Sequence, residues 1–170
     1  MRKITPAPLY PTYAELCELD NADYPALNDF IAISPSWSLN HWQWGKSFLE
    51  YTGRNKSVHT YDRFRNEIEK FLLWSFLEKK SPINELRKTD ILEYADFCWK
   101  PPINWIGTSS QERFKLNNSY FISNDLWRPF KMQAAKSQIS KEVDKKKYRP
   151  SQQTLTSTFT AIIVFYNYLM

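Results

Sequence analysis

Apolar residues recur at steps of three and four along residues 58–78, and this spacing constrains the fold more than any other feature of the chain. Because an α-helix has about 3.6 residues per turn, such steps place the apolar side chains on one helix face. Ser57 is a candidate N-cap, and Lys79 and Lys80 complement the negative end of the helix dipole. We expect a long amphipathic helix, with an apolar face of Tyr61, Phe64, Ile68, Phe71, Leu72 and Phe76.

Three further segments have helical spacing, and no segment of useful length alternates between apolar and polar residues as a half-buried strand does. The first covers residues 38–51, with Gly53 as its expected stop. The next covers residues 90–99, with Thr89 as its expected N-cap and a pair of prolines after its end. Together these segments predict an all-α fold.

The last helical segment begins after Pro150 and Ser151 and continues to Met170. Its apolar positions are Leu155, Phe159, Ile162, Ile163, Tyr166 and Leu169. No glycine, basic last turn or polar tail ends the pattern. We therefore expect the chain to be an N-terminal fragment of a longer protein.

Length and composition are those of one globular domain. The chain has 170 residues, of which 42% are hydrophobic and 16% aromatic, enough to bury a core. Collagen-like, low-complexity and wholly disordered chains are excluded. The longest apolar run near the end, residues 161–166, is far shorter than the roughly 18 residues of a membrane span. The start lacks the apolar segment of a secretory signal, so we expect no membrane partner and a cytoplasmic location.

Residues 102–149 form an insert between the third and fourth expected helices, and it is much longer than the roughly 2–8 residues of a usual helix connection. Its aromatic side chains favour an ordered insert that lies on the bundle: Trp105, Phe114, Tyr120, Phe121, Trp127 and Phe130. Within it, residues 136–148 are compatible with either a basic helix or a mobile loop.

Residues 1–37 differ in composition from the rest of the chain. Between residues 4 and 37 there are five carboxylates, five of the ten prolines and no Lys or Arg. We expect this acidic, proline-containing stretch to be an irregular N-terminal arm, followed by a helical domain over residues 38–170.

Positive charge is concentrated in one segment. Residues 126–150 contain eight basic and two acidic side chains, a net charge of +6, whereas the rest of the chain carries −1 of the total of +5. Such a local concentration is typical of a surface that binds a polyanion.

An enzymatic function of this chain has little support in the sequence. His41 and His59 are the only histidines, the residue type most often used for acid–base chemistry near neutral pH, and neither lies in a nucleophile, metal or phosphate-loop motif. Cys17 and Cys98 lie 81 positions apart without a nearby ligand residue, so no metal site or disulfide framework is expected. We expect no cofactor and no small-molecule substrate.

Two candidate carboxylates, Glu67 and Glu69, alternate with Arg65 and Lys70. We expect them to form a solvated face with ordinary ion pairs.

Two helix starts are suited to a phosphate backbone, because free N–H groups and the helix dipole already favour an anion there. Each combines cations with small polar side chains. The set at the first start is Arg54, Lys56, Ser57, His59, Thr60 and Arg63, and the set at the last helix is Lys145, Lys146, Lys147, Arg149, Ser151, Gln152 and Gln153.

A simpler interpretation stays open for each of these residues. Ser57 and Ser151 can be helix caps alone, and the lysines can be merely solvated. The tryptophans also have two uses, in base stacking or in the core. Their helical spacing favours the core for Trp42, Trp44, Trp74 and Trp99.

Short motifs follow one another along residues 38–170 in a defined order. They are Phe48-Leu49-x-Tyr51, Ser57-x-x-Thr60-Tyr61, Phe71-Leu72-x-Trp74 and Pro82-Ile83-x-x-Leu86-x-x-x-Asp90-Ile91-x-x-Tyr94, then Pro101-Pro102-x-x-Trp105 and Trp127-Arg128-Pro129-Phe130 in the insert, before the closing helix. In this order they resemble the N-terminal core-binding, or SAM-like, domain of phage-integrase-type tyrosine recombinases. The acidic arm and the size of the insert depart from that family.

The resemblance implies a four-helix, SAM-like orthogonal bundle that grips one face of duplex DNA beside other recombinase protomers. Cleavage would belong to a separate C-terminal domain with an Arg, a Lys, a His-x-x-Arg motif and a nucleophilic Tyr. Neither His41 nor His59 fits that motif, and Tyr166 and Tyr168 are expected to be helix residues. Family contacts come from the second and fourth helices, which correspond to the starts near Ser57 and Ser151.

We therefore expect a DNA-binding domain that holds a site-specific recombinase or integrase on its attachment site, with the catalytic domain outside this chain. The alternative is a helical protein-interaction module that uses the acidic arm and the aromatic insert and does not bind DNA.

Overall fold

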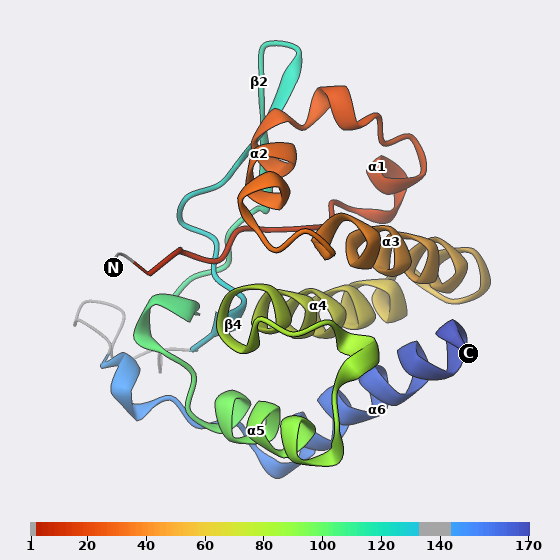
Figure 1. Cartoon of the computed structure of the whole chain (residues 1–170). Coiled ribbons are helices and arrows are strands. Elements are labelled where there is room, and N and C mark those ends of the chain that lie inside the picture. The colour runs from red at the N-terminus through yellow and green to blue at the C-terminus, as the bar shows by residue number, and fades with distance from the viewer. Residues whose placement is uncertain (1–2, 133–143) are drawn as a thin grey trace.

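The computed structural model describes residues 3–132 and 144–170, and over these ranges the chain is mostly helical with two small sheets. Figure 1 shows three layers. The N-terminal residues lie on one side, helices α3 (Ser38–Asn55) and α4 (Val58–Trp74) cross the middle, and α5 (Lys88–Trp99) and α6 (Gln152–Leu169) lie on the other side.

Helix α4 is the centre of the fold and packs against both α3 and α6. The predicted apolar face is buried, and Ser57 is the N-cap, its Oγ accepting from the N–H of Thr60 at 3.2 Å. The chain continues into a π-helical turn, Ser75–Lys79, and leaves the helix at Lys80 with a left-handed φ of 54°.

The expected stop at Gly53 is wrong, because α3 continues through it to Asn55. A Cβ at Gly53 would lie 2.2 Å from Cδ2 of Tyr13, so the absence of a side chain makes room for that ring. The expected cap at Thr89 is also wrong. Helix α5 begins two residues earlier, at Lys88, and its N-cap is Arg87, whose backbone N–H donates to Oδ2 of Asp90 at 2.7 Å.

Helix α6 begins where the sequence predicts. Ser151 is its N-cap, with Oγ accepting from the N–H of Thr154 at 3.1 Å. Its apolar face packs on α3 and α4, and the rings of Phe48 and Phe165 lie 5.1 Å apart. Not all its apolar residues are buried, since Ile163 is 59% exposed.

The prediction of an irregular N-terminal arm is wrong for the described part of residues 1–37. It contains α1 (Tyr13–Cys17), a 3₁₀ turn at Asn21–Asp23 and α2 (Pro25–Ile33). Apolar residues between the acidic positions join the same buried cluster as the helices: Leu9, Tyr10, Leu16, Tyr24, Leu27, Phe30 and Ile31. The sequence prediction gave weight to the acidic side chains of this segment. The apolar residues, which the prediction did not use, are the ones that enter the core.

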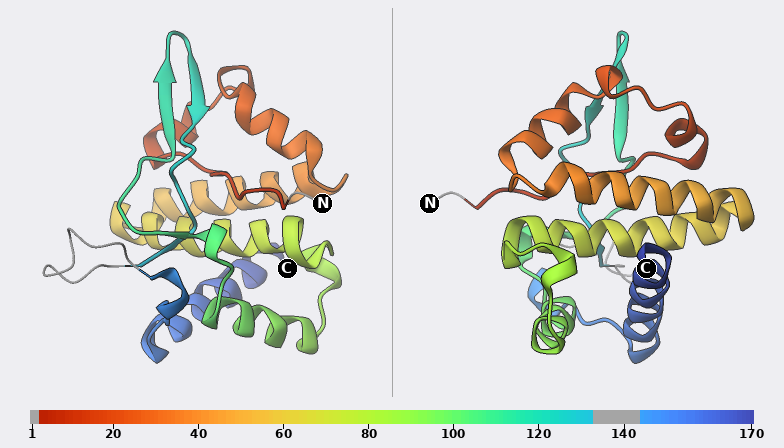
Figure 2. Two further views of the ribbon diagram at one scale, coloured as in Figure 1. Left: turned by 90° about the vertical axis from the view of Figure 1, so that its left-hand side faces the viewer. Right: turned by 45° about the vertical axis from the view of Figure 1, so that its right-hand side comes forward.

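The insert makes the prediction of an all-α fold wrong in detail. Strand β1 (Ile106–Gly107) pairs in parallel with β4 (Phe130–Lys131), and β2 (Phe114–Asn117) forms an antiparallel hairpin with β3 (Tyr120–Ser123). The hairpin lies beside α2 and projects beyond the helices (Figure 2). Tyr24 fixes it there, with its ring stacked on Phe121 at 4.7 Å. Strands of two to four residues are too short for the alternation of apolar and polar residues that would have predicted them from sequence.

The predicted order of the insert is confirmed over its described residues, where Trp105, Trp127 and Phe130 are buried. Within residues 136–148, a 3₁₀ turn covers Lys145–Lys147, and residues 136–143 lie outside the described ranges. No helix of the described residues is long and apolar enough to cross a membrane.

The tryptophans divide between core and surface. Trp42 and Trp74 are buried as predicted, Trp44 is half-buried, and Trp99 is 45% exposed at the end of α5. Cys98 is buried and Cys17 is exposed, and both are free thiols.

Candidate nucleic-acid interface

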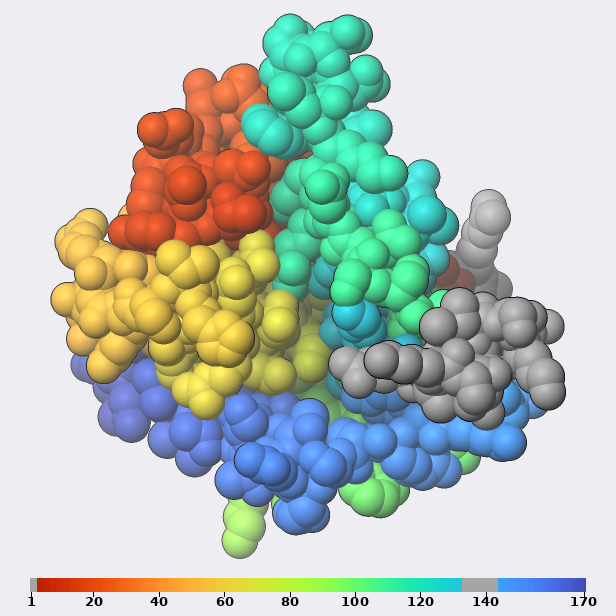
Figure 3. Space-filling model, turned by 180° about the vertical axis from the view of Figure 1, so that it is seen from behind, coloured from red at the N-terminus to blue at the C-terminus, as the bar shows by residue number. Residues whose placement is uncertain are grey.

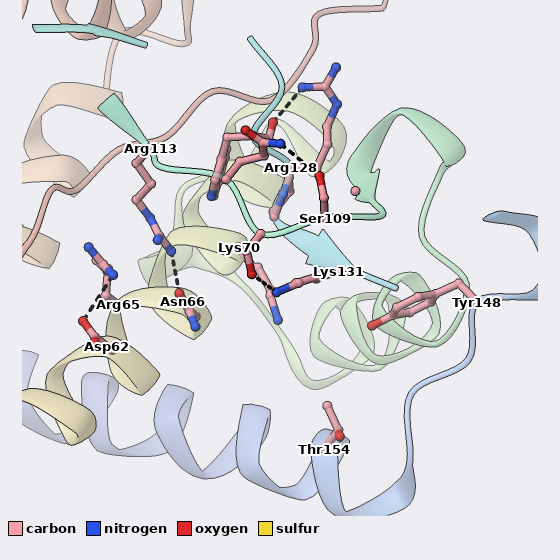
Figure 4. A pocket seen from close by; sticks show the side chains of 15 residues that line it. Asp62, Arg65, Asn66, Lys70, Ser109, Arg113, Arg128, Lys131, Tyr148 and Thr154 are labelled. Atoms are coloured by element: carbon pink, nitrogen blue, oxygen red, sulfur yellow. Dashed lines mark hydrogen bonds and ion pairs between the residues drawn. The ribbon is translucent and has the colours of Figure 1, made fainter. Parts of the chain in front are cut away.

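A cleft of about 440 Å³ lies between α4, the insert and the start of α6, and we call it the α4 cleft. Figure 4 shows its lining. Helix α4 contributes Asp62, Arg65, Asn66 and Lys70, the insert contributes residues 107–113 and 127–131 in part, and Tyr148 and Thr154 complete it. Figure 3 shows the face on which α4 (yellow), the insert (green to cyan) and the segment leading into α6 (blue) meet.

Cations dominate the lining of the α4 cleft. Five basic side chains, Arg65, Lys70, Arg113, Arg128 and Lys131, face one carboxylate, that of Asp62. They come from two parts of the chain far apart in sequence, so the fold itself concentrates the charge.

Three of these cations have acidic partners. Arg65 pairs with Asp62 at 3.2 Å within α4. Lys70 Nζ lies 3.3 Å from Glu67, and Arg113 Nε lies 3.0 Å from Glu69. Arg128 and Lys131 form no ion pair among the described residues, so no carboxylate neutralises their charges. Nη1 of Arg128 donates to the carbonyls of Asp125 and Trp127, each at 2.6 Å, and Lys131 donates to a serine hydroxyl.

The partners of Lys70 and Arg113 are not the solvated carboxylates that the sequence predicts. Glu67 is 8% and Glu69 1% exposed. Glu69 Oε2 also accepts from the backbone N–H groups of Leu9 and Tyr10, at 2.8 and 3.2 Å. A buried carboxylate requires such partners, and the N-terminal segment supplies them.

Arg113 is held from three sides. Besides Glu69, its guanidinium donates to Oδ1 of Asn66 and lies over the ring of Trp127, 5.3 Å from the centroid. This fixed position places it beside Arg65. Burial lowers the pKa of Arg65 from its usual value, and the positive charge of Arg113 lowers it further. Arg65 Nε is buried with no hydrogen-bond partner. Two guanidiniums that line the same cleft favour an anion in front of them.

The loop at residues 109–111 adds uncharged hydrogen-bonding groups to the cleft. Ser109, Ser110 and Gln111 line it, and Lys131 donates to the Ser110 hydroxyl. Hydroxyl and amide groups beside cations are typical of surfaces that hold phosphate oxygens.

The residues predicted at the α4 start lie on the surface but not in the α4 cleft. Arg54, Lys56, His59 and Arg63 are exposed, and Arg63 lies over the ring of Phe64 at 5.0 Å. Ser57 and Thr60 serve the helix cap, their hydroxyls 3.0 Å apart.

The residues predicted at the α6 start lie next to the cleft. Ser151, Gln152 and Gln153 are exposed beside Thr154, which lines it. The basic run leads up to them. Lys145, Lys146 and Arg149 line a second cavity, and Lys147 is exposed next to it.

Sequence reasoning missed most residues of the α4 cleft. Arg128 and Lys131 belong to the +6 segment, which was a usable signal. Arg65 and Lys70 were expected only in surface ion pairs, and Arg113 carried no local signal because its position depends on the buried Glu69.

His41 is a core residue. It is 2% exposed, its Nε2 accepts from the N–H of Ile83 at 2.9 Å, and burial lowers its pKa from 6.5 to about 4. Tyr166 and Tyr168 lie in α6, and the hydroxyl of Tyr166 donates to the carbonyl of Ile83 at 2.6 Å. Within residues 3–132 and 144–170, no three His, Cys, Asp or Glu side chains gather as metal ligands would.

Comparison of the chain with protein-family models, with curated proteins and with solved structures gives no match.

Proposed function

We propose that this chain is a duplex-DNA-binding domain of the kind that holds a site-specific tyrosine recombinase on its attachment site. The observation that carries the proposal is the α4 cleft, which is lined by five cations and one carboxylate. Glu67 and Glu69 pair with two of these cations from the buried side of α4. Two of those cations, Arg128 and Lys131, lack acidic partners among the described residues.

Phosphate contacts supply most of the affinity of a protein for DNA without regard to base sequence, and they need cations that are not already neutralised. The α4 cleft offers such cations on the face where α4 and α6 meet the insert (Figure 3). Its neighbours extend the positive surface: Lys145, Lys146, Lys147 and Arg149 precede the exposed polar start of α6.

The arrangement of α3, α4, α5 and α6 supports the finer part of the proposal. In a SAM-like core-binding domain, the second and fourth helices face the DNA, and α4 and α6 take these positions in chain order. In this proposal the domain works beside other recombinase protomers, and cleavage belongs to a C-terminal domain outside this chain.

Titration against duplex DNA at two ionic strengths tests the proposal. As half of a clamp, the domain should bind with a Kd of about 10⁻⁴ to 10⁻⁶ M and lose affinity steeply as salt rises, because binding releases counterions from the phosphates. Absence of binding at low salt would overturn it.

One observation favours the alternative of a protein-interaction module. The β2–β3 hairpin exposes Leu116 at 65% and Tyr120 at 54%, well away from the bulk of the helices (Figure 2). Apolar side chains at an exposed hairpin are typical of contact with a protein. Association with a protein that resists salt, without affinity for DNA, would favour this function.

A further inference from the structure

A second cavity, of about 420 Å³, lies between the end of α5 and the basic turn before α6. Its volume falls within the range of about 300–1,000 Å³ that is usual for ligand sites. Tyr148 lines both this cavity and the α4 cleft, so the two sites share a wall.

The second cavity combines positive charge with an apolar floor. Its cations are Lys100, Lys145, Lys146 and Arg149, and no acidic residue is among the described residues that line it. The floor consists of Pro101, Pro102, Ile103 and the ring of Tyr148. Ile103 is 49% exposed, so part of this apolar surface faces solvent.

Duplex phosphates do not explain the apolar part of the lining. In a duplex the bases are stacked inside, and a protein surface that meets only the backbone needs charge and hydrogen bonds. An unpaired nucleotide presents a phosphate and an apolar base face together, and proteins bind it with a positive groove and with aromatic or apolar side chains that pack against the base.

We propose that the second cavity binds an unpaired nucleotide of a DNA strand, its base on Ile103 and the prolines and its phosphate on the lysines. This inference rests on the proposed DNA-binding function. Tyr148 is the link, because it lines both cavities, so a strand with phosphates in the α4 cleft would lie next to the second cavity.

Tyr148 is suited to serve as a fixed wall between the two sites. Its side chain is half-buried, and its ring packs edge-on against Phe130 at 5.9 Å. Burial raises its pKa to about 12. A phenol is neutral at physiological pH with or without this shift, so Tyr148 does not repel a phosphate.

The test uses three labelled DNA ligands that share one duplex. The first is blunt, the second carries a single-stranded thymidine tail, and the third carries a tail of the same length made of abasic sugar-phosphate units. Both tails add the same charge, but only the thymidine tail adds bases. We expect the thymidine tail to increase affinity over the abasic tail by about fivefold or more in a fluorescence anisotropy titration.

Two variants separate the apolar floor from the rest of the surface. Ile103→Ser should abolish the difference between the two tails and leave the affinity for the blunt duplex unchanged. Ile163→Ser, which replaces another isoleucine exposed at 59%, is the matched control and should keep the difference. Circular dichroism verifies that both variants retain the wild-type fold.

Equal affinity for the two tails in the wild-type chain would overturn the inference, as would an undiminished difference in Ile103→Ser. Either result would leave the proposed duplex binding intact, since the blunt duplex reports on that alone. Conversely, the DNA with the thymidine tail could bind while the blunt duplex does not. This result would refute the proposed duplex binding but would still support a nucleotide site in the second cavity.

Discussion

Nε of Arg113 lies 3.0 Å from Oε1 of the buried Glu69, and this ion pair fastens the insert to the central helix α4. The other carboxylate oxygen of Glu69 accepts from the N–H groups of Leu9 and Tyr10. One side chain therefore joins three parts of the chain, and it also sets the position of a guanidinium in the α4 cleft.

Replacement of Glu69 should destabilise the whole fold. Glu69→Gln puts an amide where Arg113 and two backbone N–H groups need acceptors, so we expect a loss of about 3 kcal/mol in the free energy of unfolding. Urea denaturation measures it. Glu50→Gln is the control, because Glu50 pairs with Lys46 on the surface of α3 and should cost about 0.5 kcal/mol or less. Equal effects of the two changes would contradict the role of Glu69.

Gly53 should resist replacement although it lies inside a helix. Alanine is the better helix former by about 1 kcal/mol, but its Cβ would lie 2.2 Å from the Tyr13 ring. We expect Gly53→Ala to destabilise the protein by about 1–3 kcal/mol in thermal or urea unfolding. In a Tyr13→Ala background the same change should become stabilising, and destabilisation in both backgrounds would show that Tyr13 is not the cause.

Stability should fall as the pH drops from 6.5 towards 4, because of His41. The pKa of His41 is about 4 in the folded protein against an ordinary value of 6.5, so on acidification the unfolded chain takes up a proton that the folded chain does not. At pH 5 this difference costs about 2 kcal/mol relative to pH 7.5. Urea unfolding at both pH values measures the loss. His41→Gln keeps an acceptor for the N–H of Ile83 and should remove most of the dependence, and an unaltered pH profile would assign it to other groups.

The starts of α4 and α6 could be predicted from sequence because their signals are local. Ser57 and Ser151 each bond to a backbone N–H three residues on, within one turn, and no other part of the chain is needed. The prediction that Gly53 ends its helix was wrong because the cause of this glycine is not local. Glycine usually ends a helix, but here a distant ring, that of Tyr13, requires its small size.

The α4 cleft could be predicted only in part. Lys131 belongs to a basic segment visible in the sequence, but the sequence predicts a surface carboxylate at Glu69, since Glu67 and Lys70 lie close to it along the chain. Its burial depends on the N-terminal residues that cover it, and the position of Arg113 follows from that burial. Contacts across such sequence distances leave no periodic signal.

Removal of the two unpaired cations should weaken DNA binding similarly for all sequences. We expect the double variant Arg128→Gln and Lys131→Gln to bind duplex DNA about tenfold less tightly at low salt, and the slope of log K against log salt to fall by roughly two. A charge-matched control, Lys80→Asn with Lys88→Gln, removes two exposed cations outside the cleft. Asparagine is used at Lys80 because it tolerates the left-handed backbone there. An equal loss in the control would mean that net charge, not the α4 cleft, governs binding.

Aspartate at Ser151 separates the two interpretations of the α6 start. Aspartate caps a helix about as well as serine, so Ser151→Asp should leave the unfolding temperature unchanged or slightly raised. Its negative charge would repel a phosphate near the start of α6, and we expect DNA affinity to fall by about threefold to tenfold. Thr12→Asp is the control, since Thr12 caps α1 through the N–H of Glu15 and does not line the α4 cleft. Unchanged DNA affinity in Ser151→Asp would make Ser151 a helix cap alone, because a charge placed against bound phosphates cannot be silent at low salt.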